Sequence, residues 1–474
     1  MSAARPILAR PDPAEGPLAR AFFRAAGAPL VTGNHISLLA DARENYPAWF
    51  KAIAEAKRTI RCESYIIHDD DIGRQFAEAL SQKARSGVQV QVIYDWMGAF
   101  GAMSWGLWKP LRQAGVEVRC FNPPRFGGKF SWLSRDHRKM LSVDGETAFI
   151  TGLCVGRPWM GDPASGMTPW RDTGVEIHGP AVAQIEHAFA DMWSALGGAG
   201  TMNESPSHPG FTDGVGLRIV ASSPYTAGLY RFDLLLAGIA RQSIWLTDAY
   251  YLGTTPYVQA LASAARDGVD VRLLVPRSTD VPILRSFSRS GYSALLDAGV
   301  RVFEWNGSML HAKTAVVDGE WARVGSTNLN PASWIGNWEL DVIVEDRRFA
   351  ERMQGLYLQD LSNSTELVLQ NSGVRRRTKV VRARQTRAGE GSGGRAVTGL
   401  LKMSSAVHDS VIARRTLRSP EKSILLSVAL ILLAVCLVAV LWPGVTSTTV
   451  AVLSGWSCLM LLLKLWRYRA KHRP

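Results

Sequence analysis

The sequence predicts an α/β protein of two duplicated lobes, each a mixed sheet flanked by helices, with the functional site at the lobe interface. A C-terminal transmembrane helical hairpin is predicted to follow. Two observations carry this prediction: an internal repeat within residues 31–370, and two apolar segments after residue 422. The length of 474 residues also favours two lobes over one ordinary domain.

The chain begins with a polar stretch that lacks the apolar core of a secretory signal peptide, so we expect residues 1–30 to form a flexible lead-in. The five cysteines are odd in number, scattered, and without a CxxC pair. This pattern argues against a disulfide framework and against a structural zinc site. Reduced thiols and a cytoplasmic body are expected.

Within the first lobe, assigned to residues 31–200, short β-branched runs alternate with helical stretches. The predicted strands are Thr59–Ile67, Val88–Tyr94 and Val116–Phe121, and the predicted helices are Tyr46–Ala56, Gly73–Arg85 and Trp105–Gly115. Gly87 and Gly115 lie where helices should end. This alternation predicts a mixed or mostly parallel sheet covered by helices.

The second lobe, assigned to residues 201–370, repeats the first. His137, Lys139 and Asp144 recur as His311, Lys313 and Asp318, each 174 positions later. Other paired segments recur in the same order: VQVQVIYD with VDVRLLVP, and AGVEVRCF with AGVRVFEW. Because solenoid units are only about 20–50 residues long, this repeat indicates duplicated lobes.

Positive charge is concentrated after the second lobe. Of the net charge of +13, residues 371–474 contribute +15 (18 Lys or Arg against three Asp or Glu), so residues 1–370 carry −2. A nucleic-acid binder would be expected to carry its basic charge on the globular body. Residues 371–422 form a basic linker that contains the flexible sequence GEGSGG.

Residues 423–466 are predicted to form two transmembrane helices. Ser423–Trp442 is 20 residues long and uncharged, enough to span roughly 30 Å of hydrocarbon. Val450–Leu463 is apolar again but marginal in length, so a tilted or re-entrant segment is an alternative. Basic residues before the pair and in the tail 467–474 place both ends in the cytoplasm by the positive-inside rule. A pair of buried core helices is the alternative interpretation.

The two HxKxxxxD units carry the chemical prediction. Side chains at i and i+2 of a strand share a face, so His137 projects with Lys139, and His311 with Lys313. If the lobes face each other, two imidazoles and two ammonium groups meet at one point. This set suits a phosphodiester: lysines complement phosphate oxygens, while one histidine attacks phosphorus and the other transfers protons. The chemistry needs no metal and no cofactor.

The acids of these units, Asp144 and Asp318, are candidate catalytic residues, but we expect them to hold the local Asp-Gly turn. Tyr65, Tyr250 and Tyr251 follow strands that should approach the site, where they either line a lipid entrance or act as core aromatics. Four tryptophans in loops around the motifs either seat the protein in the headgroup layer or pack in the core: Trp132, Trp159, Trp170 and Trp334.

With these motifs the chain resembles the phospholipase D superfamily, whose hallmark is a duplicated HxKxxxxD followed by GSxN. The second copy fits in full, with Gly325, Ser326 and Asn328. The first copy departs from the pattern, with Thr151, Gly152 and Cys154 in the corresponding places. A thiol is a poorer hydrogen-bond partner than an amide, which puts a phosphate contact from residue 154 in doubt.

Further segments resemble the bacterial cardiolipin synthase branch over roughly residues 30–365: GNHISLL, ESYIIHDDDIGRQF, YDWMG, FNPP, PWRDTGVEIHGPAV and NWELDVIVED. This resemblance implies that an acid downstream of each motif orients that motif's histidine, here Asp172 for the first half and Glu339 for the second. It also implies that His137 is the nucleophile and His311 the acid and base. The near-symmetry of the lobes leaves the reverse assignment open.

The implied function is transfer of a phosphatidyl group, through a phosphohistidine intermediate, from one phosphatidylglycerol to another with release of glycerol. Phosphatidylethanolamine is an alternative lipid substrate, and hydrolysis to phosphatidic acid is an alternative reaction. A nuclease and an inactive lipid-binding scaffold are the alternatives from other classes. The resemblance and the hairpin together imply a multi-pass protein of the bacterial inner membrane whose catalytic body faces the cytoplasm. The sequence does not indicate the oligomeric state.

Overall fold

The computed structural model describes residues 16–100, 105–123, 134–198, 210–280, 282–370 and 373–376. The predicted membrane hairpin (423–466), the tail (467–474) and nearly all of the linker (371–422) lie outside these residues. Among the helices of the described ranges, none combines the length and the apolar character needed to cross a membrane.

The first lobe follows the predicted alternation of strands and helices. Its strands are β1 (Val31–Ala40), β2 (Thr59–Ser64), β3 (Gln89–Asp95), β4 (Glu117–Phe121), β5 (Lys139–Val143), β6 (Thr147–Thr151) and β7 (Thr173–His178). Its helices are α2 (Asp41–Glu55), α3 (Asp71–Arg85), α4 (Trp96–Ala99), α5 (Trp105–Gln113), α6 (Arg157–Met160) and α7 (Val182–Ala195). The predicted strand over Thr59–Ile67 is confirmed but ends three residues early, at Ser64.

The second lobe repeats this arrangement and adds strands at its outer edge. Its strands are β8 (Val215–Ser222), β9 (Ser243–Thr247), β10 (Asp270–Ser278), β11 (Arg301–Met309), β12 (Thr314–Val317), β13 (Trp321–Gly325), β14 (Glu339–Glu345), β15 (Ser364–Gln370) and β16 (Gly373–Arg376). Its helices are α8 (Gly228–Ile239), α9 (Thr255–Arg266), α10 (Pro282–Asp297), the π-helix η1 (Ala332–Gly336) and α11 (Arg347–Ser362).

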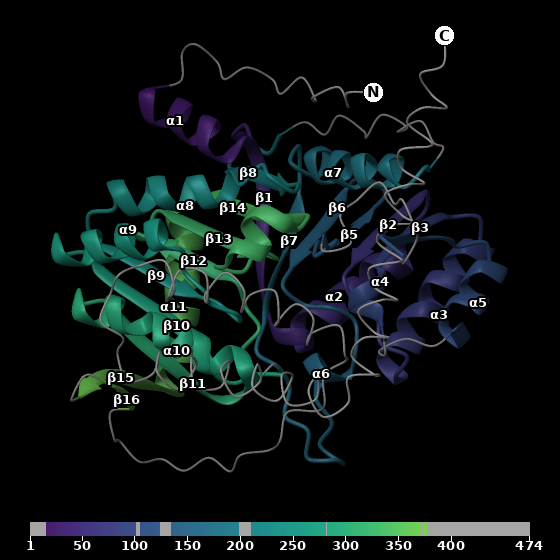
Figure 1. Cartoon of the computed structure of the whole chain (residues 1–474). Helices are drawn as coiled ribbons and strands as arrows, with labels where there is room; N and C mark the ends of the chain where they lie inside the picture. The colour runs from purple at the N-terminus through teal and green to yellow at the C-terminus, as the bar shows by residue number, and fades with distance from the viewer. Residues whose placement is uncertain are drawn as a thin grey trace, which may run out of the picture. The chain divides into compact units, whose positions relative to one another are not determined.

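All strands belong to one mixed sheet, in which the two lobes meet at β1 and β8. The order is β16-β15-β11-β10-β9-β12-β13-β14-β8-β1-β7-β6-β5-β2-β3-β4 (Figure 1). Read outward from the centre, both lobes show the same order, with β2, β3 and β4 parallel in one and β9, β10 and β11 parallel in the other. The predicted duplicated lobes and mixed sheet are therefore confirmed.

The core consists mainly of three large apolar clusters, of which the third is shared by both lobes. One lies under α2, α3 and α5 of the first lobe, and a second lies under α8, α9 and α10 of the second. The third combines residues of α7 from the first lobe with residues of α11 from the second, over central strands of both. Because this last cluster is shared, the lobes are fixed relative to each other, as a site built from both requires.

The chain crosses itself closely where the lobes join. Gly33 of β1 has φ +78°, and a Cβ atom there would lie 2.7 Å from the Cα of Gly210. Only glycine satisfies both the left-handed backbone and the close approach. The β1–β8 pairing has an irregular register at this point, between Val31 and Asn34.

The predicted flexible lead-in over 1–30 is wrong for part of its length. Pro17–Ala26 form helix α1, which packs on α8 and buries Phe22 and Ala26 in the second lobe's core. The apolar residues of FFRAA lie on one face of this helix, and that helical spacing was the signal in the sequence.

Candidate active site

Each HxK segment leads into a strand at the lobe interface and is held there by the backbone of the opposite lobe. Lys139 is the first residue of β5, and Lys313 immediately precedes β12. The His137 N–H donates to the carbonyl of Trp338 at 2.9 Å, and the His311 N–H to the carbonyl of Arg171 at 2.7 Å. Each acceptor residue comes directly before an acidic residue of the site, Glu339 or Asp172.

The histidine–acid pairs cross between the lobes. His137 Nδ1 lies 2.9 Å from Glu339 Oε2, and His311 Nδ1 lies 2.7 Å from Asp172 Oδ2. Both acids are fully buried. The expectation that each acid orients the histidine of its own half is therefore wrong. The sheet brings the start of each acid's strand to the opposite HxK segment, through bridges Asp136–Trp338 and Arg171–Leu310.

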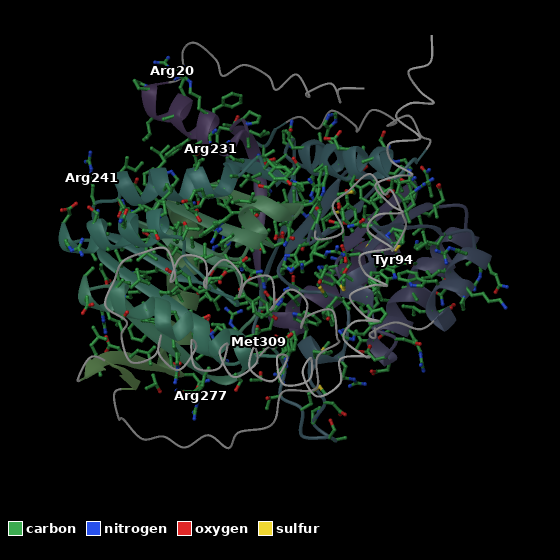
Figure 2. The ribbon with its side chains drawn as sticks, viewed as in Figure 1. Arg20, Tyr94, Arg231, Arg241, Arg277 and Met309 are labelled. Atoms are coloured by element: carbon green, nitrogen blue, oxygen red, sulfur yellow. The ribbon has the colours of Figure 1, made fainter. Side chains whose placement is uncertain are left out.

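Met309 lies where the two lobes make these crossed contacts. It is the last residue of β11, yet its side chain is buried within the first lobe's apolar cluster. Figure 2 labels Met309 near the middle of the view. Its carbonyl accepts a hydrogen bond from the Arg171 N–H at 2.9 Å. The Arg171 guanidinium in turn donates to Asp360 at 2.8 Å and lies 3.2 Å from Asp41, which fixes the segment that carries Asp172.

The two lysines lie beside their own histidines. Lys139 Nζ donates to the His137 carbonyl at 2.5 Å, and Lys313 Nζ donates to the His311 carbonyl. Both side chains are buried. Burial lowers the pKa of Lys313 to about 8, with the nearby Lys139 ammonium contributing and Asp172 opposing the shift. Both ammonium groups are thus held beside the histidines.

Both imidazoles have pKa values lowered far enough that they are neutral at neutral pH in the free enzyme. Burial lowers the pKa of His137 to about 4, against the opposing effect of Glu339, and Lys139 and Lys313 lower it further. The pKa of His311 is likewise lowered to about 4 by burial and by the same two lysines. Each histidine is thus affected by the charge of both lysines, one from each lobe.

The acids fix the tautomer of each ring. Burial alone would raise the pKa of Asp172 and Glu339, but the facing histidine and lysine lower it below the ordinary value. An ionised carboxylate only accepts hydrogen bonds, so the proton of each imidazole lies on Nδ1 and the lone pair on Nε2. Nε2 is therefore the nitrogen available to a substrate.

Asp144 and Asp318 hold turns, at the far end of the motif strands. The Asp144 carboxylate accepts backbone N–H bonds from Lys57, Arg58 and Thr59 at 2.7–2.8 Å. Asp318 accepts the equivalent bonds from residues 241–243 at 2.8–2.9 Å. Both have left-handed φ, 56° and 52°, which aspartate tolerates better than most residues. These contacts match the structural role expected for them and give neither carboxylate a contact with the histidines.

The downstream motifs support the acids in two different ways. In the second copy, the Ser326 hydroxyl donates to Glu339 Oε2 at 2.6 Å. In the first copy Gly152 takes the place of this serine, and a Cβ there would lie 2.1 Å from Asp172 Oδ1. Instead Trp159 Nε1 donates to Asp172 Oδ2 at 2.9 Å, and its ring meets the His311 ring edge-on at 5.5 Å. Trp159 is therefore a site residue that the motif comparison did not identify.

The structure also decides between the alternatives for the other tryptophans that it describes. Trp159, Trp170 and Trp334 are all buried, so of the two alternatives core packing holds for these three. Trp170 packs against both Trp159 and His311, with ring centroids 4.8 and 5.6 Å apart. Trp132 lies outside the described residues.

Asn328 and Cys154 occupy equivalent positions with different chemistry. Both are buried, and in the described structure the Oδ1 atom of Asn328 has no hydrogen-bond partner. Burial raises the pKa of the Cys154 thiol, which stays neutral. Thr151, at the start of this segment, uses its hydroxyl to accept the Leu153 N–H at 3.0 Å. Polar contact with a ligand is therefore favoured at Asn328.

Two of the three tyrosines flank the histidines. The Tyr65 ring lies 4.9 Å from the His137 ring, and the Tyr250 ring lies 6.0 Å from the His311 ring. The ammonium groups of Lys139 and Lys313 lie 5.3 and 5.9 Å from the centres of the Tyr65 and Tyr250 rings. Tyr251 instead belongs to the second lobe's apolar cluster.

Comparisons with known proteins agree with this site. The family described as "Cardiolipin synthase, PLD-like domain" matches residues 50–193 and 236–361. Cardiolipin synthase of Halalkalibacterium halodurans is 32% identical over 359 residues, which cover 74% of this chain and 70% of that protein. Cardiolipin synthase A of Pseudomonas syringae is 33% identical over 368 residues, covering 76% and 75%.

Among solved structures, phosphatidylserine synthase of Haemophilus influenzae shares the fold, with a TM-score of 0.59 and 14% identity over 73% of this chain and 91% of that one. The matched ranges include both HxK segments and both orienting acids. The chain therefore belongs to the cardiolipin synthase family of phospholipase D-like proteins.

Proposed function

We propose that this protein is a phosphatidyltransferase that makes cardiolipin from two molecules of phosphatidylglycerol and releases glycerol. Its relatives are cardiolipin synthases. The observation that carries the proposal is the pair of crossed, buried histidine–carboxylate contacts, His137–Glu339 and His311–Asp172, with a lysine beside each histidine. One neutral imidazole serves as nucleophile and the other as proton carrier.

In the first step, Nε2 of His137 attacks the phosphorus of phosphatidylglycerol. The bond from phosphorus to the glycerol oxygen breaks, and His311 supplies the proton that the glycerol oxygen takes. His311 must therefore be protonated when the lipid is bound. A phosphodiester anion beside the imidazoles favours that cationic form, so substrate binding raises the pKa of His311 above its value of about 4 in the free enzyme.

In the second step, a hydroxyl of another phosphatidylglycerol attacks the phosphatidyl group on His137. Its proton passes to Nε2 of His311, and the P–N bond breaks. Lys139 and Lys313 stabilise the charge that grows on the phosphoryl oxygens, and Glu339 stabilises the cationic form of His137. These residues account for the reaction without a resident cofactor.

Residues 371–474 attach the catalytic body to the membrane in this proposal. Residues 423–466 form the transmembrane hairpin, and 371–422 form the basic linker between the hairpin and the two lobes, 31–200 and 201–370. The uncharged length of Ser423–Trp442 and the basic flanks support this arrangement. It places the body on the cytoplasmic face of a bacterial inner membrane, where anionic headgroups attract the linker. Protease protection in oriented vesicles tests it, since a hairpin leaves both flanks cleavable from the same side.

The reaction is tested on purified full-length protein in mixed micelles of phosphatidylglycerol, with and without phosphatidylethanolamine. We expect cardiolipin and glycerol in equal amounts from phosphatidylglycerol alone, and neither from His137→Ala or His311→Ala. Phosphatidic acid as the sole lipid product would identify a hydrolase. A strict requirement for phosphatidylethanolamine would show that the donor or acceptor is assigned incorrectly.

A further inference from the structure

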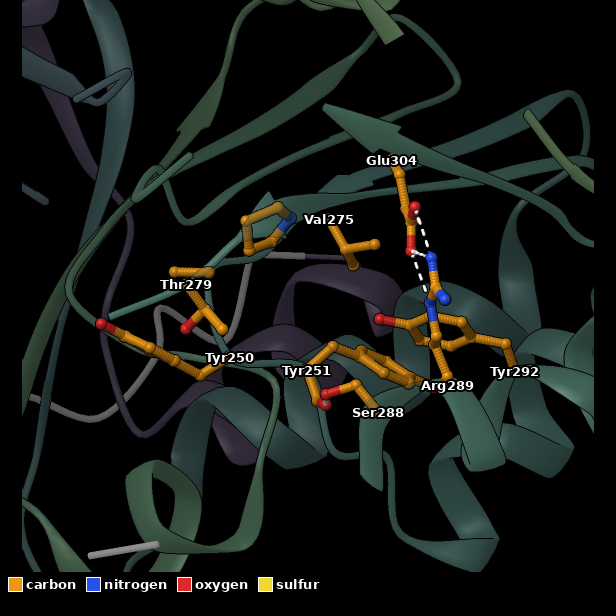
Figure 3. A pocket seen from close by; sticks show the side chains of 10 residues that line it. Tyr250, Tyr251, Val275, Thr279, Ser288, Arg289, Tyr292 and Glu304 are labelled. Atoms are coloured by element: carbon orange, nitrogen blue, oxygen red, sulfur yellow. Dashed lines mark hydrogen bonds and ion pairs between the residues drawn. The ribbon is translucent and has the colours of Figure 1, made fainter. Parts of the chain in front are cut away.

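The second lobe contains a pocket next to the proposed proton carrier. It lies between strands β10 and β11, helix α10 and the segment that follows β9. Tyr250 lies at one end of the group of side chains drawn in Figure 3, and the Arg289–Glu304 pair at the other. Because the Tyr250 ring also lies 6.0 Å from the His311 ring, one side chain joins the pocket to the active site.

The lining also reaches the lobe interface. Ala249, which precedes Tyr250, lines the pocket and is buried within the first lobe's apolar cluster. The hollow therefore lies on the side of the active site that carries His311. An in-line displacement by His137 puts the departing alcohol opposite the attacking nitrogen, next to the proton carrier. The pocket lies where the alcohol portion of the substrate is expected.

The equivalent place in the first lobe is filled. The repeated segments match Val275 with Tyr94, Tyr292 with Trp108, and Glu304 with Cys120. Tyr94 and Trp108 stack face to face there, with ring centroids 4.4 Å apart. Replacement of Tyr94 by valine and of Trp108 by the smaller tyrosine leaves space in the second lobe. The two lobes thus differ at this point, and the pocket lies in the second lobe, on the side of His311.

The chemistry of the lining suits a neutral polyol. Arg289 contacts both carboxylate oxygens of Glu304, the closest at 2.5 Å, so the charged pair adds no net charge. Such a fork donates and accepts hydrogen bonds side by side, which matches neighbouring hydroxyl groups. Ser288 and Tyr251 add hydroxyls, and that of Tyr251 is buried without a hydrogen-bond partner in the described structure.

Other headgroups match this lining less well. A cationic ethanolamine group would need an unneutralised acid, and Glu304 is already paired with Arg289. A second phosphate would need an unneutralised cation, and Arg289 is occupied by the same contact. Glycerol brings neighbouring hydroxyls and no charge, which this lining matches.

We propose that this pocket is the alcohol subsite of the enzyme, binding the glycerol group that leaves in the first step and the glycerol headgroup that accepts in the second. The inference rests on the proposed function and adds the residues that select the alcohol. In the accepting step the glycerol oxygen bonds to phosphorus and the P–N bond to His137 breaks. The hydroxyl proton passes to His311.

Transfer to an added alcohol gives a direct test, because free glycerol then serves as the probe. Full-length enzyme receives phosphatidyl-p-nitrophenol as donor, whose leaving group is not a glycerol, with either glycerol or methanol as acceptor. Phosphatidylglycerol or phosphatidylmethanol is then measured. Methanol reaches phosphorus without needing the pocket. Two variants change the pocket differently: Val275→Tyr fills it with the residue of the first lobe, and Arg289→Met with Glu304→Leu removes the fork. Removing both charges avoids a buried unpaired charge.

A matched control removes another ion pair from the same strand. Arg301 and Glu366 join β11 to β15 through a 2.9 Å contact and do not line the pocket. Arg301→Met with Glu366→Leu should leave both acceptors unchanged. Thermal unfolding of every variant shows which proteins are folded.

We expect wild type to saturate with glycerol, and the fork variant to raise the KM for glycerol about tenfold or more, equivalent to about 1.4 kcal/mol of binding. The methanol rate should stay within about twofold of wild type. Parallel losses with both acceptors, no loss with glycerol, or saturation by ethanolamine in place of glycerol would each overturn the assignment. Transfer by wild type to neither alcohol would instead overturn the proposed function on which the assignment rests.

Discussion

Asp172→Asn should disable His311 and leave His137 working, although Asp172 and His137 belong to the same half of the sequence. The substitution keeps the size of the side chain and removes its charge. Oδ2 of Asp172 is the shared acceptor of His311 Nδ1 at 2.7 Å and of Trp159 Nε1 at 2.9 Å, in a fully buried position. No direct contact with His137 is described for it.

The size of the effect follows from these bonds. A hydrogen bond to a buried charged group contributes about 1.5–3 kcal/mol, which is about 10- to 150-fold in rate. An asparagine amide that turns its NH₂ group toward Nδ1 also favours the wrong imidazole tautomer, which adds to the loss. We therefore expect overall phosphatidyl transfer to fall by at least about 10- to 150-fold.

A donor with a good leaving group separates the two histidines. Phosphatidyl-p-nitrophenol releases nitrophenolate without a proton, so the first step does not need the proton carrier. If His137 is the nucleophile, Asp172→Asn and His311→Ala should both retain the initial burst of nitrophenolate, whereas Glu339→Gln and His137→Ala should lose it. The reverse roles would invert the pattern but still group Asp172 with His311. Grouping of Asp172 with His137 would refute the crossed arrangement.

Three further predictions follow from the site and its supports. Trp159→Phe should lower overall transfer roughly tenfold or more by removing one hydrogen bond to Asp172. Ser326→Ala should instead slow the nitrophenolate burst. If the two variants changed the burst equally, Trp159 and Ser326 would not act through different acids. Asp318→Ala should lower the free energy of unfolding by about 2–3 kcal/mol, because three backbone N–H groups lose their acceptor. The kcat per folded molecule should stay unchanged. An unaltered denaturant midpoint, or a loss of kcat in the folded variant, would contradict the turn-holding role. With phosphatidyl-p-nitrophenol, whose leaving group needs no proton from His311, the kcat/KM for nitrophenolate release should fall below pH about 4, where His137 takes up a proton in the free enzyme. It should also fall above pH about 8, where Lys313 loses a proton. A profile flat from pH 7 to 10 would exclude a need for the Lys313 cation.

Burial of the two histidines should also make folding sensitive to pH. Their pKa values are lowered from 6.5 to about 4, so the unfolded chain binds more protons between these limits. The histidines therefore destabilise the fold as pH falls from about 6.5 toward 4. Replacing His311 by Gln should make the unfolding free energy less steep over this window, and an unchanged slope would show that His311 is not buried in its neutral form.

The duplicated lobes and the converging HxK pairs could be predicted from sequence because both rest on local spacing. Two identical units 174 positions apart define the repeat, and the period of a strand places His and Lys on one face. The turn-holding role of Asp144 and Asp318 could also be predicted from sequence, because Asp-Gly after a strand is a local turn signal.

The crossed acids could not be predicted in the same way. Asp172 lies 35 positions after His137 and Glu339 lies 28 positions after His311, and the resemblance paired each acid with the motif that precedes it, which is the wrong pairing. Which histidine each acid contacts depends on how the two halves of the sheet join at β1 and β8, and this pairing is a long-range property of the fold. Trp159 was missed for a related reason: it replaces Ser326 in function from a different position in the chain. The helix α1 was missed because a short amphipathic stretch gained its partner only from the second lobe.

The covalent intermediate provides the most direct test of two-histidine phosphatidyl transfer. His311→Ala is mixed with phosphatidyl-p-nitrophenol, quenched, digested at neutral or alkaline pH, and the modified peptide is identified by mass spectrometry. We expect a phosphatidyl group on His137 in this variant and no adduct in His137→Ala. An unmodified enzyme that still releases nitrophenolate would contradict a phosphohistidine mechanism.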